Sequence, residues 1–357
     1  MVTLLNCIER IPSLINRTLD EREEIFGGVK EMTEAFSGPV REIILVGSGT
    51  SSTAILTAQP FMEKVTKKPV RLLLPGAAVD PDTALPKDAL YVFLSQTGTS
   101  ALVQDAHRRI SALGYACLTM TENGDTDLAK MSSRHLSLTC GPEEYGMRTI
   151  GYTISVLDLE LLALYLALAE GTLGEEEFNE YIDDAKKVPE SLTKVIADTH
   201  LFFRRNQRQM MRSRCIVFTG AKALYGLSLE AAVKFWEMPQ VISIGYELEE
   251  GMHGPNYGYD TPHCVIVMTT GSEGEEKGRN LARYMKEVFH NGLLVGPEPL
   301  DDSDLRLVPQ SENFQVLEFS AVPQVLAYDL AEAGGRDLTV PSDLSLMESY
   351  FSTHTHW

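Results

Sequence analysis

Short apolar runs recur along the chain, and stretches with helical amphipathic spacing separate most of them. The first half contains the runs 42–47, 70–74, 90–95, 115–120 and 135–139. The second half contains the runs 215–220, 241–245, 264–270, 292–296 and 315–320. The runs are apolar almost throughout instead of alternating, which is typical of parallel strands buried on both faces of a sheet.

Strand–helix alternation of this kind predicts a doubly wound α/β fold. Because five strands occur twice, we expect an internal duplication: two doubly wound five-stranded parallel sheets, each a flavodoxin-like sandwich. The predicted organisation is a helical segment over 1–37, a first α/β domain over 38–173, a helical connector over 174–206, a second domain over 207–335 and a C-terminal tail over 336–357.

The net charge of the chain limits the classes of molecule that it is expected to bind. Among 357 residues, 44% are hydrophobic, enough for a large core, and the formal net charge is −19. We expect no basic surface to offset this charge, so nucleic acid and anionic membranes are disfavoured as partners. An anionic ligand would have to be bound by local geometry, against the field of the whole protein.

The cysteines, the N-terminus and the longest apolar stretch together indicate the cellular compartment of the protein. The five cysteines are scattered without a C-x-x-C pair, which predicts no disulfide framework and no zinc site. The N-terminus has early acids and no basic region, unlike a signal peptide. The longest apolar stretch, 154–169, is expected to be too short and too acidic to span a bilayer. These features predict a cytoplasmic protein.

Two predicted strands end in loops rich in glycine and hydroxyl groups. The strand at 42–46 is followed by Gly47, Ser48, Gly49, Thr50, Ser51 and Ser52, and the strand at 90–94 by Ser95, Gln96, Thr97, Gly98, Thr99 and Ser100. Ligands of doubly wound sheets bind at the carboxyl ends of the strands, where helix N-termini present free N–H groups. Loops 48–52 and 95–100 are therefore candidates for a lysine-free phosphate site. The alternative is ordinary Ser/Thr helix capping.

A predicted helix at 227–240 carries three charged residues on one face. Glu230, Lys234 and Glu237 are spaced i, i+4 and i+7. A solvent-facing Glu–Lys pair would have the same spacing. The rest of the helix is largely apolar, however, which favours a functional set that moves protons.

A histidine follows an acidic cluster sixteen residues after Glu237. In "YELEEGMHGPNYGYD" (246–260), His253 stands directly before Gly254 and Pro255. A histidine held in a kinked backbone beside carboxylates suits proton transfer, and an incidental surface histidine is the alternative. The neighbouring carboxylates of Glu249 and Glu250 are expected to favour the imidazolium form of His253.

Four segments together resemble the double SIS-domain phosphosugar isomerase and deglycase family. "GSGTSS" resembles C-G-T-S, "SQTGTS" resembles S-Q-S-G-E-T, "LEAAVKFWEM" resembles L-E-G-A-L-K-x-x-E, and "EEGMHGP" resembles G-E-x-x-H-G-P. They occur in the family's order and cover nearly the whole chain. The resemblance is to the isomerase half of glucosamine-6-phosphate synthase and to fructosamine-6-phosphate deglycases, and it implies tandem SIS domains.

The resemblance also implies roles for individual residues. It implies phosphate contacts from Ser51, Ser95, Gln96, Thr97 and Ser100, with Glu250 matched to the family pattern near the sugar. It implies that Glu237 moves protons between C1 and C2, and that His253 acts in ring opening across a dimer interface. Lys234 and Glu230 complete the predicted acid–base set.

The tail departs from the synthase pattern. The family has a basic residue and a catalytic lysine here, and this chain has Ser342 and Leu346 at those positions, with Pro341 and Leu344 matching. His354 and His356 could substitute, although a frayed terminus is the simpler expectation.

The reaction expected from these features is carbon–nitrogen bond cleavage. The chain shows no glutaminase segment to generate ammonia, and a carboxylate and a histidine suffice for acid–base cleavage. We therefore expect a deglycase that releases an amine and a hexose 6-phosphate, acting as a homodimer or higher homo-oligomer. The eight histidines are dispersed, so no metal and no cofactor are expected. The alternatives are an isomerase or deaminase of amino-sugar phosphates, and a non-catalytic sugar-phosphate sensor.

Overall fold

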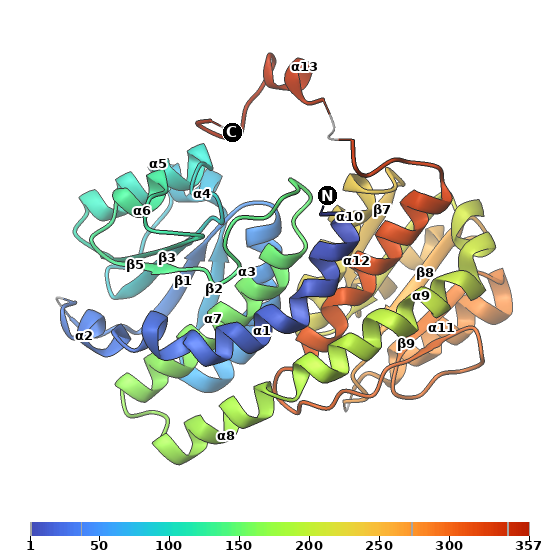
Figure 1. Ribbon diagram of the computed structural model, residues 1–357, viewed down its shortest axis with the longest axis horizontal. Helices are drawn as coiled ribbons and strands as arrows, with labels where there is room; N and C mark the ends of the chain where they lie inside the picture. The colour runs from blue at the N-terminus through green and yellow to red at the C-terminus, as the bar shows by residue number, and fades with distance from the viewer. Residues whose placement is uncertain (1, 37, 273, 341–342, 357) are drawn as a thin grey trace. The chain divides into compact units, whose positions relative to one another are not determined.

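The structure, a computed structural model, describes residues 2–36, 38–272, 274–340 and 343–356. Two five-stranded sheets are formed, and the strand pairs within each are parallel (Figure 1). The predicted α/β class with two parallel five-stranded sheets is confirmed.

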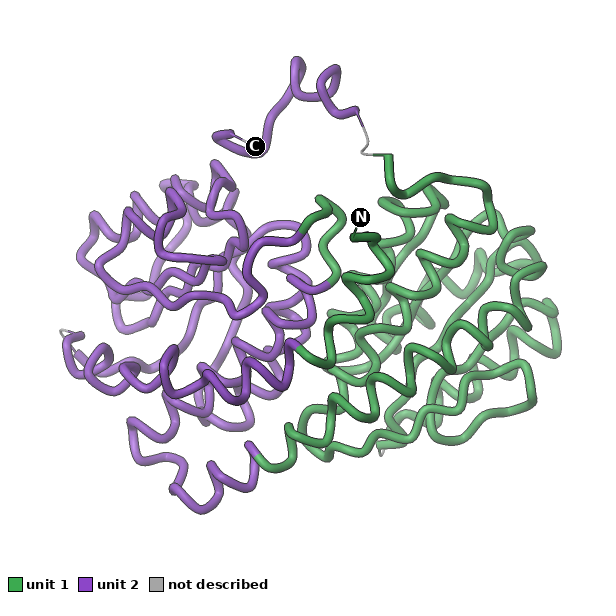
Figure 2. Tube along the Cα trace, in the orientation of Figure 1, with its two compact units in different colours: residues 1–13, 144–149, 183–340 green, residues 14–143, 150–182, 341–357 purple. Residues whose placement is uncertain are grey.

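The chain divides into two compact units (Figure 2). Unit 1 contains residues 1–13, 144–149 and 183–340, and unit 2 contains residues 14–143, 150–182 and 341–357. Each unit contains one sheet, and the long helix α1 (Leu4–Phe26) contributes residues to both units.

The sheet of unit 2 has the strand order β2-β1-β3-β4-β5. Its strands are β1 (Glu42–Val46), β2 (Val70–Leu73), β3 (Ala89–Leu94), β4 (Ala116–Thr121) and β5 (His135–Ser137). The accompanying helices are α2 (Val29–Glu34), α3 (Thr50–Thr66), α4 (Pro75–Val79), α5 (Ala101–Ala112), α6 (Asp127–Lys130), α7 (Ile150–Ala169), α8 (Glu175–Ala185) and α13 (Ser345–Glu348). Helices α3 and α7 pack together, and a 2.8 Å hydrogen bond joins the hydroxyls of Thr57 and Tyr152.

The sheet of unit 1 has the strand order β10-β9-β8-β6-β7. Its strands are β6 (Cys215–Gly220), β7 (Ser243–Glu247), β8 (His263–Met268), β9 (Gly292–Gly296) and β10 (Leu305–Arg306). Its helices are α9 (Val188–Arg212), α10 (Ala223–Glu237), α11 (Glu276–Phe289) and α12 (Gln315–Ala333), with short 3₁₀ turns η1 (Glu250–Met252) and η2 (Pro255–Gly258). Phe235 of α10 meets Phe218 of β6 edge to face, with ring centroids 4.9 Å apart.

The two sheets repeat one topology. Numbered from the first strand of each half, both orders read 2-1-3-4-5, which is the flavodoxin-like order. In that order the helices leave the sheet in opposite directions after the first and third strands, creating a switch point where ligands bind. The switch point of unit 2 lies between β1 and β3, the two strands that precede loops 48–52 and 95–100.

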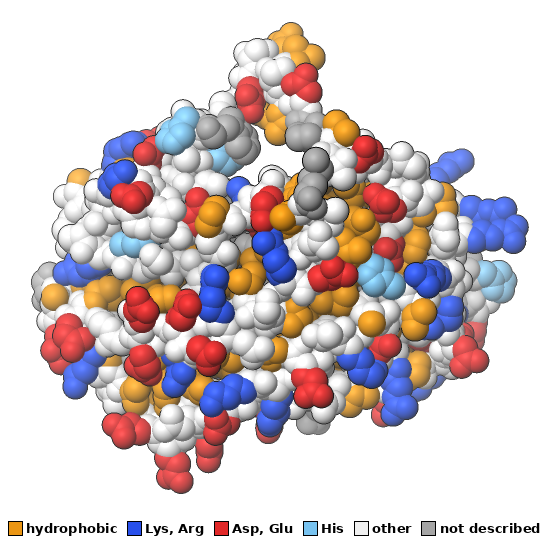
Figure 3. Space-filling view, viewed as in Figure 1, with side chains coloured by type: hydrophobic (Ala, Val, Ile, Leu, Met, Phe, Trp, Pro, Cys, Tyr) orange, Lys and Arg blue, Asp and Glu red, His pale blue; other side chains and the backbone are white. Residues whose placement is uncertain are grey.

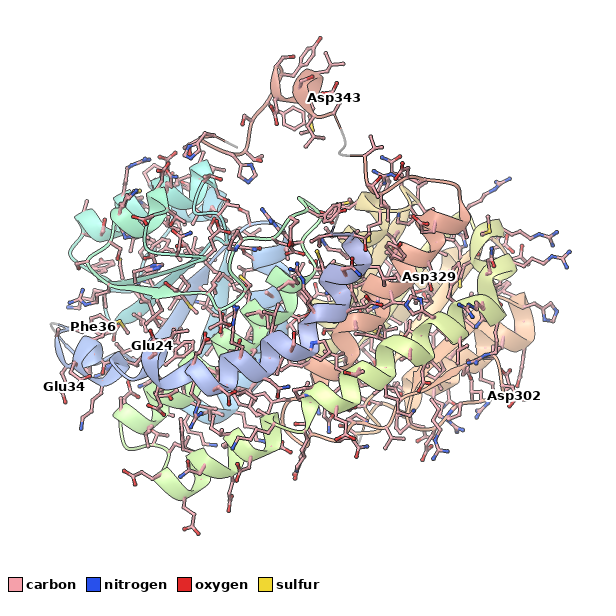
Figure 4. All side chains as sticks on the ribbon, in the orientation of Figure 1. Glu24, Glu34, Phe36, Asp302, Asp329 and Asp343 are labelled. Carbon is pink, nitrogen blue, oxygen red and sulfur yellow. The ribbon has the colours of Figure 1, made fainter. Side chains whose placement is uncertain are left out.

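One predicted strand is wrong. The run 315–320 begins helix α12, and the fifth strand of this sheet is instead the two-residue β10. Helix α12 is buried on nearly every side, so its sequence lacks a polar stripe and a short part of it has the composition of a buried strand. Asp329, near the end of α12, pairs with His200 of α9 at 2.8 Å (Figure 4).

Helix α7 is longer than the sequence indicated. It spans 20 residues, so among the described residues it is one helix that is long and apolar enough to cross a membrane. The expectation that this segment is too short is therefore wrong. Its most apolar window is 89% buried inside the protein, which is also characteristic of a core helix.

Candidate functional site

The loop after β1 combines a left-handed glycine with exposed hydroxyls. Gly49 has φ of 57° and directly precedes α3, while a Cβ at Gly47 would press against Ile55, Ser51 and the Leu94 carbonyl. The hydroxyl of Ser52 donates to the Gly49 carbonyl at 2.7 Å, so this hydroxyl is used within the loop. The hydroxyls of Ser48 and Ser51 have no partner among the described residues and remain available to a ligand.

The loop after β3 is more deeply buried. Ser95, Gln96 and Thr99 are each less than one tenth exposed. The Ser95 hydroxyl lies 3.3 Å from that of Ser100, and the hydroxyls of Thr97 and Thr99 lie 2.9 Å apart. Four hydroxyls are thus gathered within six residues at the carboxyl end of a central strand.

Two glycines allow this loop to pack. Gly98 has φ of 68°, and a Cβ there would lie 2.6 Å from the Cβ of Thr126. The Gln96 side chain donates to the Gly141 carbonyl at 3.2 Å and passes over Gly151 at the start of α7. A Cβ on Gly151 would lie 2.0 Å from Gln96 Oε1, so this position must be glycine to hold Gln96 in place. The sequence alone gave no signal for Gly151.

Helix capping does not explain these hydroxyls. The residues that precede α3 and α5 are Gly49 and Ser100, and neither makes a side-chain capping bond. A serine that stands at the cap position without capping leaves its hydroxyl for another acceptor. This observation favours the anion-binding interpretation of loop 95–100 over the capping alternative.

The corresponding loop of unit 1 already holds an anion. It follows β8, the third strand of the repeat, and includes Thr270, Gly271 and Ser272. Their N–H groups donate to one carboxylate oxygen of Glu275 at 2.6, 2.9 and 3.2 Å. Glu275 is itself buried. In unit 1, the loop after the third strand of the sheet therefore binds a carboxylate through its N–H groups. In unit 2, the equivalent loop, 95–100, carries hydroxyl groups and no such carboxylate.

The C-terminal tail pairs with the phosphate-loop candidate in unit 2. Ala101 donates its N–H to the Thr353 carbonyl at 3.0 Å, and Thr355 donates to the Thr99 carbonyl at 2.8 Å. Ser100 and His354 form an antiparallel bridge. The expectation of a frayed terminus is wrong for this segment. Pro341 and Ser342 lie outside the described residues, and Leu346 is exposed.

In unit 1, Glu230, Lys234 and Glu237 lie on one face of α10 as their spacing predicts. The Lys234 ammonium contacts Glu230 Oε1 at 3.2 Å and Glu237 Oε2 at 2.5 Å. The side chains of Glu230 and Lys234 are fully buried, whereas that of Glu237 is 32% exposed. The solvent-facing alternative is therefore wrong for this pair.

The buried lysine is held in its charged form. Burial alone would lower the pKa of Lys234, but the carboxylates of Glu230 and Glu237 outweigh it and raise this pKa above the usual value. A charged lysine cannot act as a nucleophile or a base, so its role is to hold Glu237. Arg336 further fixes the end of α10 by donating to the carbonyls of Glu237 and Met238. Sequence reasoning missed Arg336.

The turn that carries His253 is organised by backbone contacts. His253 Nδ1 donates to the Glu249 carbonyl at 2.9 Å, and the imidazole is exposed. Gly254, with φ of 99°, reverses the chain after it. The Glu247 carboxylate accepts from the N–H groups of Glu249 and Glu250 at 2.7 and 3.1 Å.

The Glu249 carboxylate makes its closest contacts with a lysine. Glu249 binds Lys277 through both carboxylate oxygens at 2.9 Å, and this lysine lowers the pKa of Glu249. Among the described residues no carboxylate forms an ion pair with His253. The acidic cluster therefore orders the turn, and the imidazole that the turn carries is exposed.

Glu237 and His253 lie at opposite ends of strand β7. Helix α10 runs against the strand: Trp236 donates to the carbonyl of Ser243, where β7 begins. At the other end, Leu248 donates to the carbonyl of Gly220 just before the His253 turn. Four residue steps of strand separate these ends by roughly 13 Å. Within unit 1, Glu237 and the His253 turn are therefore held near opposite ends of the same strand.

No group of three or more His, Cys, Asp or Glu side chains suited to a metal ion occurs in the part of the chain that the structure describes. The five cysteines are all buried, as small core residues are, and they form no disulfide within the described residues.

Comparisons with known proteins agree with this geometry. Residues 39–168 match the SIS domain model. The glutamine–fructose-6-phosphate aminotransferase (isomerizing) of Clostridium tetani (strain Massachusetts / E88) is 23% identical over 355 residues, which cover 96% of this chain and 58% of that relative. The chain thus spans little more than half the length of the curated relatives it matches.

Two solved structures share the fold. The C-terminal domain of glucosamine-fructose-6-phosphate aminotransferase from Francisella tularensis superimposes with a TM-score of 0.81 at 20% identity, covering 94% of this chain and 97% of that one. Glucosamine-6-phosphate deaminase from Thermotoga maritima gives a TM-score of 0.66 at 23% identity, covering 91% and 97%.

Residues 39–168 therefore match an SIS domain, and the chain as a whole shares the fold of these two solved structures. The predicted resemblance to double SIS-domain phosphosugar proteins is confirmed. More particularly, nearly the whole chain is similar to glutamine–fructose-6-phosphate aminotransferases (isomerizing) and to the C-terminal domain from Francisella tularensis.

Proposed function

We propose that the chain is an enzyme that transfers protons between C1 and C2 of a 6-phosphorylated amino or fructosamine sugar. The observation that carries this proposal is loop 95–100, where four buried or partly buried hydroxyls gather beside the switch point of the sheet. Hydroxyl and N–H donors bind a phosphate without adding positive charge, which suits a chain of net charge −19.

The phosphate is bound by Ser51, Ser95, Gln96, Thr97 and Ser100, with Ser48, Gly49 and Thr50 shaping the first loop. Ser95→Ala with Thr97→Ala is expected to raise KM for a phosphosugar. Each hydrogen bond to a charged group contributes about 1.5–3 kcal/mol, so the rise is at least about tenfold. KM is measured by steady-state kinetics, with Ser111→Ala on α5 as control, because its hydroxyl donates only to the Arg108 carbonyl. Unchanged KM in the double variant would place the phosphate elsewhere.

The acid–base work belongs to unit 1 residues. Glu237 is the base at C1 and C2, because its Oε2 is held by Lys234 while the partly exposed carboxylate leaves Oε1 to reach a substrate. Lys234 and Glu230 orient it. His253 assists ring opening, with Glu250 beside it on the same turn.

We further propose that the working form is a homodimer or higher oligomer in which His253 serves the sugar of a partner subunit. The separation of Glu237 and His253 along β7 supports this, because each is otherwise half of an acid–base set. Light scattering is expected to show at least a dimer, and a fully active monomer would contradict the proposal.

The favoured reaction is deglycation. Removal of a C1 proton from a fructosamine 6-phosphate and its return at C2 converts the ketoamine into an aldimine, which water cleaves to an amine and a hexose 6-phosphate. This sequence needs only acid–base groups. Lys234 is bound between two carboxylates, and the tail segment 336–357 contains no lysine, so these positions offer no free amine for covalent catalysis.

Incubation with a panel of 6-phosphorylated fructosamines, followed by an assay for glucose 6-phosphate, tests the substrate class. Release from one or more members supports deglycation. Conversion of glucosamine 6-phosphate or of a ketose phosphate alone would favour the deaminase or isomerase alternative, and tight binding of phosphosugars without turnover would favour a sensor.

A further inference from the structure

The acidic chain contains one strongly basic segment. Between Asp198 and Glu230 there is no carboxylate side chain, while residues 204–214 contain five arginines: Arg204, Arg205, Arg208, Arg212 and Arg214. The expectation that no basic surface offsets the negative charge is therefore wrong. Figure 3 shows Lys and Arg side chains gathered at the right-hand edge of the viewed face, over the region of α9 and α11.

Three of these arginines line a pocket within unit 1. Arg205, Arg208 and Arg212 follow an i, i+3, i+7 spacing and so share one face of the last turns of α9. They border a pocket of about 550 Å³ together with Thr261, His290 and Asn291. That volume falls within the range of small-molecule sites.

No carboxylate lines this pocket. None of the five arginines forms an ion pair within the described residues, although the chain has 50 acidic residues that could supply partners. Arg205 donates to the Asp304 carbonyl at 3.1 Å. Like charges at i+3 and i+4 spacing on a helix destabilise it by a few tenths of a kcal/mol per pair. An anion in the pocket would remove that repulsion.

The floor of the pocket is rigid. Asn291 is buried, and its amide donates to the Ser213 hydroxyl at 3.0 Å and to the Thr261 carbonyl at 2.7 Å. These contacts tie together the segments that precede β6, β8 and β9. His290, the left-handed residue that ends α11, donates from Nδ1 to the Lys286 carbonyl at 3.1 Å. The arginines therefore share the pocket with polar side chains that hydrogen bonds hold in place.

The pocket is separate from the proposed catalytic residues. It lies at the amino ends of β6, β8 and β9, whereas ligands of doubly wound sheets bind at the carboxyl ends. The repeat's own copy of the phosphate loop, after β8, is filled by Glu275. No residue of α10 or of the His253 turn borders the pocket.

We propose that the pocket formed by Arg205, Arg208 and Arg212 binds a small phosphorylated anion at a site separate from the sugar-phosphate site. Guanidinium groups suit this ligand because their paired donors match phosphate oxygens bidentately. Extended nucleic acid is disfavoured, since the rest of the chain is strongly acidic.

The test uses pyrophosphate as the probe and isothermal titration calorimetry on the full chain. To remove the proposed sugar-phosphate site, all proteins carry Ser95→Ala and Thr97→Ala. Adding Arg208→Gln and Arg212→Gln is expected to weaken binding at least tenfold. The matched control adds Arg204→Gln and Arg214→Gln, which removes the same charge from exposed positions outside the pocket and is expected to change binding less than threefold.

Titrations with other ligands identify which kind of phosphorylated molecule the pocket prefers. Titration with inorganic phosphate, a sugar bisphosphate and a single-stranded oligonucleotide compares free anions with a macromolecule. Tighter binding of the small polyphosphates supports the proposal. Equal weakening by the two pairs of arginine substitutions, tighter binding of the oligonucleotide, or absence of pyrophosphate binding to a folded parent protein would overturn it. Thermal midpoints of all variants confirm that they fold.

Discussion

Glu237→Gln and His253→Ala are each expected to lower kcat by about 10²–10⁴-fold, the usual loss for an acid–base group. Glu237→Gln keeps the shape of the side chain and a hydrogen-bonding oxygen near Lys234, but it cannot accept a proton. His253 is exposed and makes one local backbone contact, so its loss should not disturb the core. Phosphosugar binding and the thermal midpoint should therefore change little in either variant.

Mixing the two variants gives a sharper test of how they cooperate. If Glu237 and His253 act on one sugar from different subunits, each variant alone is inactive. Subunit exchange then produces heterodimers with one intact site, and the mixture should recover about one quarter of wild-type activity, because half of the dimers have one of two sites restored. A mixture that stays inactive after exchange is shown to be complete would mean that both residues serve a site within one chain, or that one of them is misassigned. Full activity in either single variant would remove that residue from the mechanism.

Lys234→Met is expected to cost about 3–5 kcal/mol of folding free energy, because it leaves the buried Glu230 carboxylate without its cation. The double variant Glu230→Gln with Lys234→Met removes both buried charges and should regain most of that stability. Both variants lose the group that holds Glu237, so kcat should stay low in both. The double variant would thus separate the effect of Glu230 and Lys234 on stability from their effect on kcat.

Denaturant unfolding measures these changes. The control is Lys194→Met on α9, which breaks an exposed i, i+4 pair with Asp198 and should cost no more than about 1 kcal/mol. Because the pKa of Lys234 is raised above 10.5 in the folded chain, its contribution is complete below that pH and declines only as the pH rises through the folded-state value. Equal losses for Lys194→Met and Lys234→Met would contradict the buried ion-pair account.

The sequence predicted the fold correctly where an apolar run was compatible with only one type of secondary structure. Runs such as 42–47 and 215–220 are apolar throughout and flanked by glycine, and they form the central strands β1 and β6. The segment 315–320 has the same composition but continues as a 19-residue helix. Burial on all sides removes the periodicity that distinguishes a helix from a strand.

The site was predictable residue by residue but not as an arrangement. Spacing placed Glu230, Lys234 and Glu237 on one helix face, and glycine with hydroxyls marked loop 95–100. Spacing along a chain does not reveal direction in space, however, so it did not predict that Glu237 and the His253 turn lie near opposite ends of β7. Glu275 was open to prediction, because "TTGSEGEE" has the composition of the phosphate-loop candidates with a carboxylate added.

The arginine pocket shows that the net charge of a chain does not predict the charge of each local binding site. A net charge of −19 describes the average surface and hides the local excess of arginine at 204–214. Local binding depends on the charges within a Debye length of about 8–10 Å, which is comparable to the size of a pocket.

The central claim, proton transfer between C1 and C2, is tested most directly with a fructosamine 6-phosphate carrying two deuterium atoms at C1. Mass spectrometry and NMR of the sugar product report how many remain there. The account predicts a hexose 6-phosphate with one deuterium at C1, because one is removed by Glu237 before the aldimine forms. A sugar phosphate released with both deuterium atoms still at C1 would show that the carbon–nitrogen bond breaks without this transfer, and would contradict the account.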